Sequence, residues 1–146
     1  MATFSRTVEV DWAGSIMEGT GTAKAGTGAF TLPVSFPSRV GEPAGKTSPE
    51  ELMAASHASC YAMALNATVG RKNGSIARTH VTATIVADKG DAGIKLTTSK
   101  LKVVAEGLQG IAPGDFNAVA KEAEGKCPIS NALRGSLAIE LETEVK

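Results

Sequence analysis

Cysteine, aromatic residues and net charge are all scarce in this sequence of 146 residues. Aromatic residues make up 4% of the chain, so its core must be built mainly from Val, Ile, Leu, Ala and Met. The 15 basic and 15 acidic residues cancel, and no basic stripe or polybasic cluster is visible. These absences argue against nucleic acid and against an anionic membrane surface as partners.

Long uninterrupted apolar runs are also missing. The first residues, Met1–Arg6, lack the apolar stretch of a signal peptide. The longest apolar segment, residues 52–69, is interrupted by two serines, a histidine and an asparagine, so it predicts a buried helix and not a membrane span. We therefore expect a cytoplasmic protein, in which thiols are normally kept reduced and a permanent structural disulfide is disfavoured.

The hydrophobic pattern predicts an α+β fold with antiparallel sheet, in a single domain that spans residues 1–146. Hydrophobic residues make up 42% of the chain, which is long enough to bury one core. Segments that alternate between apolar and polar residues predict strands, and helix-start and helix-stop signals predict helices. Strands are expected over residues 4–12, 16–24, 30–36, 80–89, 94–106 and 137–145, and helices over residues 49–69, 115–124 and 128–134.

A strong helix start opens the longest predicted helix. Ser48 suits the N-cap, Pro49 the first helical position, and Glu51 the reciprocal position of a capping box. The helix is expected to run to about Val69 and to stop at Gly70. Its apolar residues lie on nearly every side, which predicts burial on most faces against a sheet, a second helix or another subunit.

The only two cysteines lie in different elements, Cys60 inside the long helix and Cys127 at the start of the short one. Two such thiols suit a redox pair, in which one sulfur reacts and the other resolves the product as a disulfide. Alternatively, Cys60 is a small inert core residue and Cys127 only caps its helix, although a helix start also favours a thiolate. Two cysteines and two histidines without ligand spacing argue against a zinc site, so no metal is expected.

Charged residues near the long helix offer a way to activate a thiol. Capping explains Glu51, but Glu50 is less completely explained and could position Arg39, which lies 11 residues upstream in a loop rich in Gly and Pro. An arginine beside Cys60 would supply the charge that holds a thiolate. The plainer alternative for Arg39 is a solvated loop arginine.

The distance between Glu50 and Cys60 bears on assembly. They are ten residues apart on one helix, or about 15 Å along its axis, which is too far for one small site. If both serve one site, Glu50 must come from a second, roughly antiparallel copy of the helix. This predicts a symmetric dimer with composite sites. His57, three residues before Cys60, could be a base, but a satisfied core or interface histidine is the simpler interpretation.

The cysteines belong to a double motif made of Thr47–Leu52, Ala55–Cys60 and, after a long interval, Cys127–Ser130. This motif resembles that of the OsmC/Ohr family of osmotically inducible and organic hydroperoxide resistance proteins. The resemblance covers essentially the whole chain, and its two parts together are far more specific than either cysteine alone. The His-Ala-Ser-Cys context and the position of Arg39 resemble the OsmC branch of the family.

This resemblance implies an interlocked homodimer, in which antiparallel sheets wrap two long central helices and two composite sites lie at the interface. It also implies a cysteine-based peroxidase that reduces organic hydroperoxides. Cys60 would be the peroxidatic thiolate, and Cys127 would resolve its sulfenic acid as a Cys60–Cys127 disulfide. Arg39 would stabilise the thiolate and polarise the peroxide, and Glu50 would orient Arg39. A dithiol such as dihydrolipoamide would be the reductant, with no metal, haem or flavin required.

Two other functions stay open. The chain could be a redox sensor or ligand-binding dimer, in which the same disulfide signals to a partner protein without sustained turnover. It could also be a structural protein whose cysteines are inert. If the chain is a peroxidase, side chains such as Leu52, Met53 and Tyr61 are expected to line an apolar channel that favours alkyl hydroperoxides over hydrogen peroxide.

Overall fold

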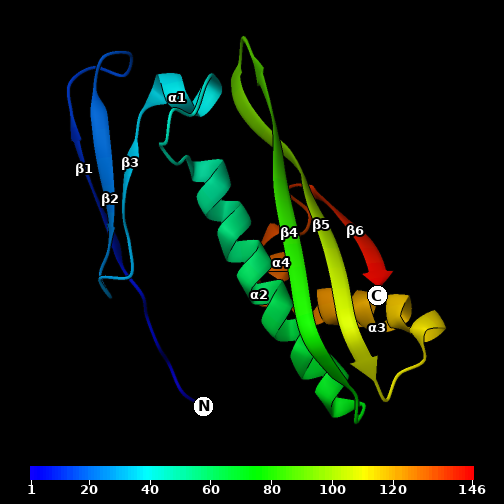
Figure 1. The fold of residues 1–146 in the computed structure, drawn as a ribbon. Helices are drawn as coiled ribbons and strands as arrows, with labels where there is room; N and C mark the ends of the chain where they lie inside the picture. The colour runs from blue at the N-terminus through cyan, green and yellow to red at the C-terminus, as the bar shows by residue number, and fades with distance from the viewer. The chain divides into compact units, whose positions relative to one another are not determined.

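Strands from the two ends of the chain form two separate sheets, one in each of the two units into which the chain divides, Met1–Leu52 and Met53–Lys146. The computed structural model describes all of residues 1–146 (Figure 1). The expected α+β class is confirmed, and the order of the elements follows the sequence analysis apart from two short helical segments. No helix is long and apolar enough to cross a lipid bilayer.

The N-terminal unit contains an antiparallel meander, in the order β1 (Val8–Ala13), β2 (Thr20–Ala25) and β3 (Thr31–Val34). A Cβ atom at Gly21 of β2 would lie 2.8 Å from the Trp12 ring and 2.9 Å from a Val34 methyl carbon. Glycine therefore lets side chains from both neighbouring strands approach the start of β2 closely.

The edge strand β1 is more exposed than the alternation of its residues predicts. All six residues of β1 are exposed in the single chain, and even Trp12 keeps 42% of its surface accessible. The prediction of a half-buried strand is therefore wrong for the single chain. Alternation shows which face of a strand is apolar, but it does not show what covers that face.

A short helix that the sequence analysis missed follows β3. This helix, α1 (Phe36–Val40), lies where a loop was expected. The Ser38 amide donates to the Ser35 hydroxyl at 3.3 Å, and a proline stands in the first turn. Both are ordinary helix-start signals, but five residues are too few for a hydrophobic period to be recognised. The helix matters because it carries Arg39.

The long helix α2 (Pro49–Arg71) begins as predicted. The Glu51 amide donates to the Ser48 hydroxyl at 3.1 Å, so Ser48 is the N-cap. The Glu51 carboxylate instead accepts from the Thr47 hydroxyl at 2.7 Å, so the expected capping box is only half formed. The helix passes Gly70 and ends at Arg71, two residues beyond the predicted end at Val69 and close to Asn73, whose φ of 59° turns the chain.

The C-terminal unit is built on a long hairpin of β4 (Ser75–Gly90) and β5 (Gly93–Gln109), with a bulge between Val86 and Ala87. The last strand, β6 (Ala138–Val145), pairs with β5 in parallel, so the expected antiparallel sheet is in fact mixed. Its direction follows from the connection, because a crossover through helices returns the chain to the end of the sheet from which β5 started. That crossover contains a 3₁₀ turn, Pro113–Asp115, and the helices α3 (Phe116–Lys126) and α4 (Pro128–Leu133).

The core of the C-terminal unit lies between α2, β5 and α3, and Figure 1 shows α2 running beside the hairpin. The buried residues of α2 form one stripe, whereas Met63 on another side is 73% exposed. Burial of α2 on most faces is therefore not found within one chain. The main core residues are Tyr61, Leu65, Val69, Leu101, Val103, Ala105, Phe116, Val119, Ala120 and Ala123.

Candidate active site

The fold brings the two cysteines together in the C-terminal unit. Cys60 is half-buried on α2, and Cys127 is fully buried as the N-cap of α4. Both are free thiols, and Cys127 lies close enough to Cys60 to raise the pKa of the Cys60 thiol. Sequence alone could not place these two sulfurs in space, because the β4–β5 hairpin and α3 lie between their two helices.

The first turn of α4 offers a backbone N–H to each sulfur. The Ile129 amide favours the charged form of Cys60, and the Ser130 amide donates to the Cys127 sulfur at 3.5 Å. Pro128 stands at the start of this helix and fits there because its missing N–H would have no intrahelical partner. The two thiols therefore share the start of one helix.

Within its own unit, Cys60 is held as a neutral thiol. Burial raises the pKa of Cys60, the Ile129 amide lowers it, and the neighbouring Cys127 raises it again, so the balance is upward. No positive side chain is among these influences. Because the thiolate and not the thiol is the nucleophilic form of cysteine, a positive charge beside Cys60 would favour its reactive form.

The N-terminal unit supplies an arginine already held by a carboxylate. Arg39 Nε donates to both oxygens of Glu50 at 3.1 Å, and Arg39 Nη2 donates to Glu50 Oε1 at 2.6 Å. These side chains are 29% and 16% exposed. The bonds raise the pKa of Arg39 and lower that of Glu50 against the opposing effect of burial, so the pair is charged at neutral pH. It fixes α1 to the first turn of α2 and presents one guanidinium in a set orientation.

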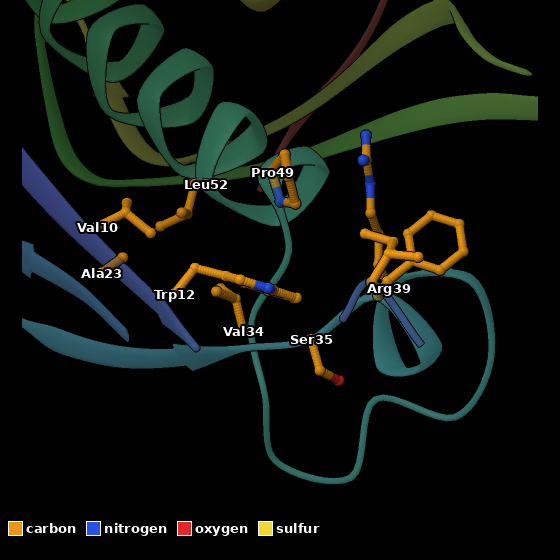
Figure 2. Close-up of a pocket in the computed structure, with 10 residues that line it drawn as sticks. Val10, Trp12, Ala23, Val34, Ser35, Arg39, Pro49 and Leu52 are labelled. Atoms are coloured by element: carbon orange, nitrogen blue, oxygen red, sulfur yellow. The ribbon is translucent and has the colours of Figure 1, made fainter. Parts of the chain in front are cut away.

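An apolar pocket of about 270 Å³ lies beside Arg39 within the N-terminal unit. Figure 2 shows Trp12, Val34 and Leu52 around it, with Arg39 at its edge. Leu52 thus lines a pocket, as expected. Tyr61 does not, because it is fully buried in the core of the other unit and its hydroxyl donates to the Ala120 carbonyl at 3.0 Å. The contributions of β1 and β3 were missed, although the apolar face predicted for residues 4–12 was a usable signal.

Both ring nitrogens of His57 have hydrogen-bond partners within the C-terminal unit. It is fully buried, with Nδ1 2.6 Å from the Ser99 hydroxyl and Nε2 2.7 Å from the Ser130 hydroxyl. The interpretation of His57 as a satisfied core histidine is confirmed. Burial lowers its pKa against a smaller upward effect of Glu124, so the imidazole is neutral at neutral pH. Ser130 belongs to the Cys127–Ser130 motif, but its contact with His57 and that of Ser99 were not predicted, because no local pattern links positions so far apart.

The buried histidine should make the fold sensitive to acid. Because its folded-state pKa is lowered, the unfolded chain binds the additional proton below about pH 6.5, and stability falls as pH drops through that value. We expect the wild-type melting temperature to fall between pH 7.5 and pH 5, and to fall less in His57→Gln. His80→Gln is the control, since it removes the other histidine. Equal pH dependence in wild type and His57→Gln would contradict this assignment.

Comparison with known proteins identifies the family of this chain. The family model described as OsmC-like protein matches residues 41–142. Peroxiredoxin OsmC of Escherichia coli K12 is 32% identical over 133 residues, which cover 90% of this chain and 92% of that protein. The chain belongs to the OsmC family. Organic hydroperoxide resistance protein OhrA of Bacillus subtilis is 37% identical over 98 residues, which cover 66% of both chains.

Solved structures of this family share the fold. An organic hydroperoxide resistance protein OsmC from Legionella pneumophila superposes with a TM-score of 0.79 at 23% identity, over 99% of both chains. One from Elizabethkingia anophelis superposes with a TM-score of 0.76 at 24% identity, over 100% of both chains. No cluster of three or more His, Cys, Asp or Glu side chains is placed to hold a metal ion.

Proposed function

We propose that this OsmC-family protein is a thiol peroxidase that reduces organic hydroperoxides to alcohols. The observation that carries the proposal is the adjacency of Cys60 and Cys127 at the start of α4, with a backbone amide directed at each sulfur. An inert core cysteine would need neither a second thiol nor these donors. The names of the relatives, a peroxiredoxin and organic hydroperoxide resistance proteins, support the same chemistry.

The reaction needs both cysteines in sequence. The Cys60 thiolate attacks a peroxide oxygen, the O–O bond breaks, and the alkoxide takes a proton and leaves as an alcohol. Cys60 is then a sulfenic acid. The Cys127 sulfur attacks it to form a Cys60–Cys127 disulfide and releases water. An external dithiol of the dihydrolipoamide type reduces this disulfide to two thiols and itself becomes a cyclic disulfide, so no bound cofactor takes part.

Activation of Cys60 is assigned to the Arg39–Glu50 pair of a second subunit. Glu50 and Cys60 lie on one helix, ten residues and about 15 Å apart, so the pair of the same helix is too far away. A guanidinium near Cys60 would lower the raised pKa of this thiol and polarise the peroxide. The exposed apolar residues of β1 support burial against another chain, because large exposed apolar patches mark interfaces.

Substrate preference is assigned to the apolar pocket beside Arg39. Its lining by Val10, Trp12 and Leu52 suits an alkyl or aryl group, while the guanidinium at its edge suits the peroxide oxygens. Hydrogen peroxide has no group to fill this pocket. The bulky end of an organic hydroperoxide therefore supplies binding free energy that hydrogen peroxide cannot supply.

The test is consumption of cumene hydroperoxide by the purified protein with dihydrolipoamide, with hydrogen peroxide measured in parallel. We expect many turnovers per Cys60 and at least about a tenfold faster reaction with cumene hydroperoxide, as a filled apolar pocket requires. Equal rates with the two peroxides would refute the assignment of the pocket. A single stoichiometric oxidation would favour the redox sensor. No reaction, with Cys60 still titrating as a thiol, would refute the peroxidase.

A further inference from the structure

A second contact lies one helical turn away from the sulfur pair. His57 precedes Cys60 by three residues on α2, and Ser130 follows Cys127 by three residues on α4. The two helices therefore meet in two places. In one the two cysteines are neighbours, and in the other His57 Nε2 lies 2.7 Å from the Ser130 hydroxyl. Two points of contact, each offset by one turn, fix the register and the rotation of α4 against α2.

This second contact is in the dry core. Both His57 and Ser130 are completely buried, so their hydrogen bond has no water to compete with it. The other nitrogen of the imidazole meets the Ser99 hydroxyl of β5 at 2.6 Å, which sets the plane of the ring. His57 therefore links α4 to strand β5. The Ser130 amide in turn donates a hydrogen bond to the Cys127 sulfur.

We propose that the His57–Ser130 hydrogen bond positions Cys127 for attack on oxidised Cys60 and thereby favours the Cys60–Cys127 disulfide. His57 and Ser130 are positioning residues, since neither touches the peroxide. The inference rests on the disulfide of the proposed function. It deepens that function by naming the residues that govern the resolving step.

The resolving step demands such control. A disulfide forms only within a narrow range of separation and torsion, whereas two neighbouring thiols tolerate a wider range. Cys127 must reach the Cys60 sulfenic acid, form the S–S bond and release water before a second peroxide oxidises the sulfenic acid to a sulfinic acid. A helix start held at two points keeps the effective concentration of Cys127 high, because fewer orientations of its sulfur compete with the productive one.

The alternative is that His57 merely fills the core, and Ser99 separates the two explanations. Ser99→Ala and Ser130→Ala each remove the serine hydroxyl that is hydrogen-bonded to the buried imidazole of His57. Each substitution leaves one imidazole nitrogen without its partner. Both should lower the melting temperature to a similar extent. Only Ser130 lies on the helix that carries Cys127, so only Ser130→Ala should alter the chemistry of the disulfide.

The decisive measurement is the reduction potential of the Cys60–Cys127 pair, determined by equilibrating the protein with mixtures of reduced and oxidised lipoamide. We expect Ser130→Ala to lower the equilibrium constant for the disulfide about tenfold, a shift of about 30 mV toward less negative potential. Ser99→Ala should stay within about twofold of wild type, because Ser99 lies on β5 and its loss leaves the contact of His57 with Ser130 on α4 in place. Equal shifts in both variants, or none in Ser130→Ala, would overturn the proposal.

A kinetic measurement supplements the potential and uses His57→Gln as a further variant. With excess cumene hydroperoxide, Ser130→Ala and His57→Gln should accumulate Cys60 sulfinic acid faster than wild type or Ser99→Ala, as judged from intact mass. Unchanged sulfinic acid in His57→Gln would contradict the positioning role even if Ser130→Ala failed to fold. The potential needs no peroxide, so it tests the hydrogen bond separately from the proposed peroxidase activity.

Discussion

Replacement of Cys60 by serine should reduce the turnover of cumene hydroperoxide to the uncatalysed background. In the proposed mechanism the Cys60 thiolate is the group that accepts an oxygen atom from the peroxide, and a serine hydroxyl cannot be oxidised in this way. The substitution removes one sulfur from a half-buried position, so the fold should survive. Turnover with dihydrolipoamide and the melting temperature are measured on the same preparation.

The matched control for Cys60→Ser is Cys127→Ser, which removes the other thiol of the pair. It should react once, release one equivalent of alcohol and stop at a Cys60 sulfenic acid, detectable as an added oxygen on that residue. Loss of the first oxidation in Cys127→Ser would instead make Cys127 the nucleophile. Persistent turnover in Cys60→Ser would exclude the mechanism altogether.

Much of the fold could be predicted from local sequence patterns. The start of α2 is specified by Ser48 and Pro49, whose roles depend only on neighbouring residues. The parallel pairing of β6 was not predictable in the same way, since strand direction depends on where the crossover returns the chain. The exposure of β1 shows a second limit, because a pattern identifies an apolar face but not its cover.

In the candidate site as well, contacts between residues near in sequence could be predicted, whereas contacts between distant residues could not. Arg39 and Glu50 are brought together across only 11 residues, and the acidic helix start already suggested that they could pair. The contact of His57 with Ser99 and Ser130 spans 42 and 73 residues, and it depends on the packing of three elements. No periodicity or spacing contains that information, so long-range polar contacts are what the structure adds to the sequence.

Arg39→Gln should lower the rate of peroxide reduction about 10²-fold to 10³-fold, the size expected when one preorganised charge at a reacting oxygen is lost. Arg39→Lys should not restore the rate, because an ammonium cannot reproduce the two nitrogens that meet Glu50. Glu50→Gln should have a smaller effect, since the guanidinium keeps its charge and loses only its orientation. The rate constant for the first oxidation is measured by stopped flow, and a Glu50→Gln defect larger than that of Arg39→Gln would reverse the assigned roles.

A mixed dimer decides which subunit supplies the arginine. One subunit carries Arg39→Gln and its partner carries Cys60→Ser, with two affinity tags to isolate the mixed species. If Arg39 acts on Cys60 of the other chain, one of the two sites is intact and roughly half of the wild-type activity remains. The matched control pairs a wild-type subunit with one that carries both substitutions. That dimer should be nearly inactive, because its intact Cys60 faces glutamine and its intact Arg39 faces serine. The reverse result, with the control active and the first dimer inactive, would place Arg39 and Cys60 of one chain in the same site and refute the composite arrangement.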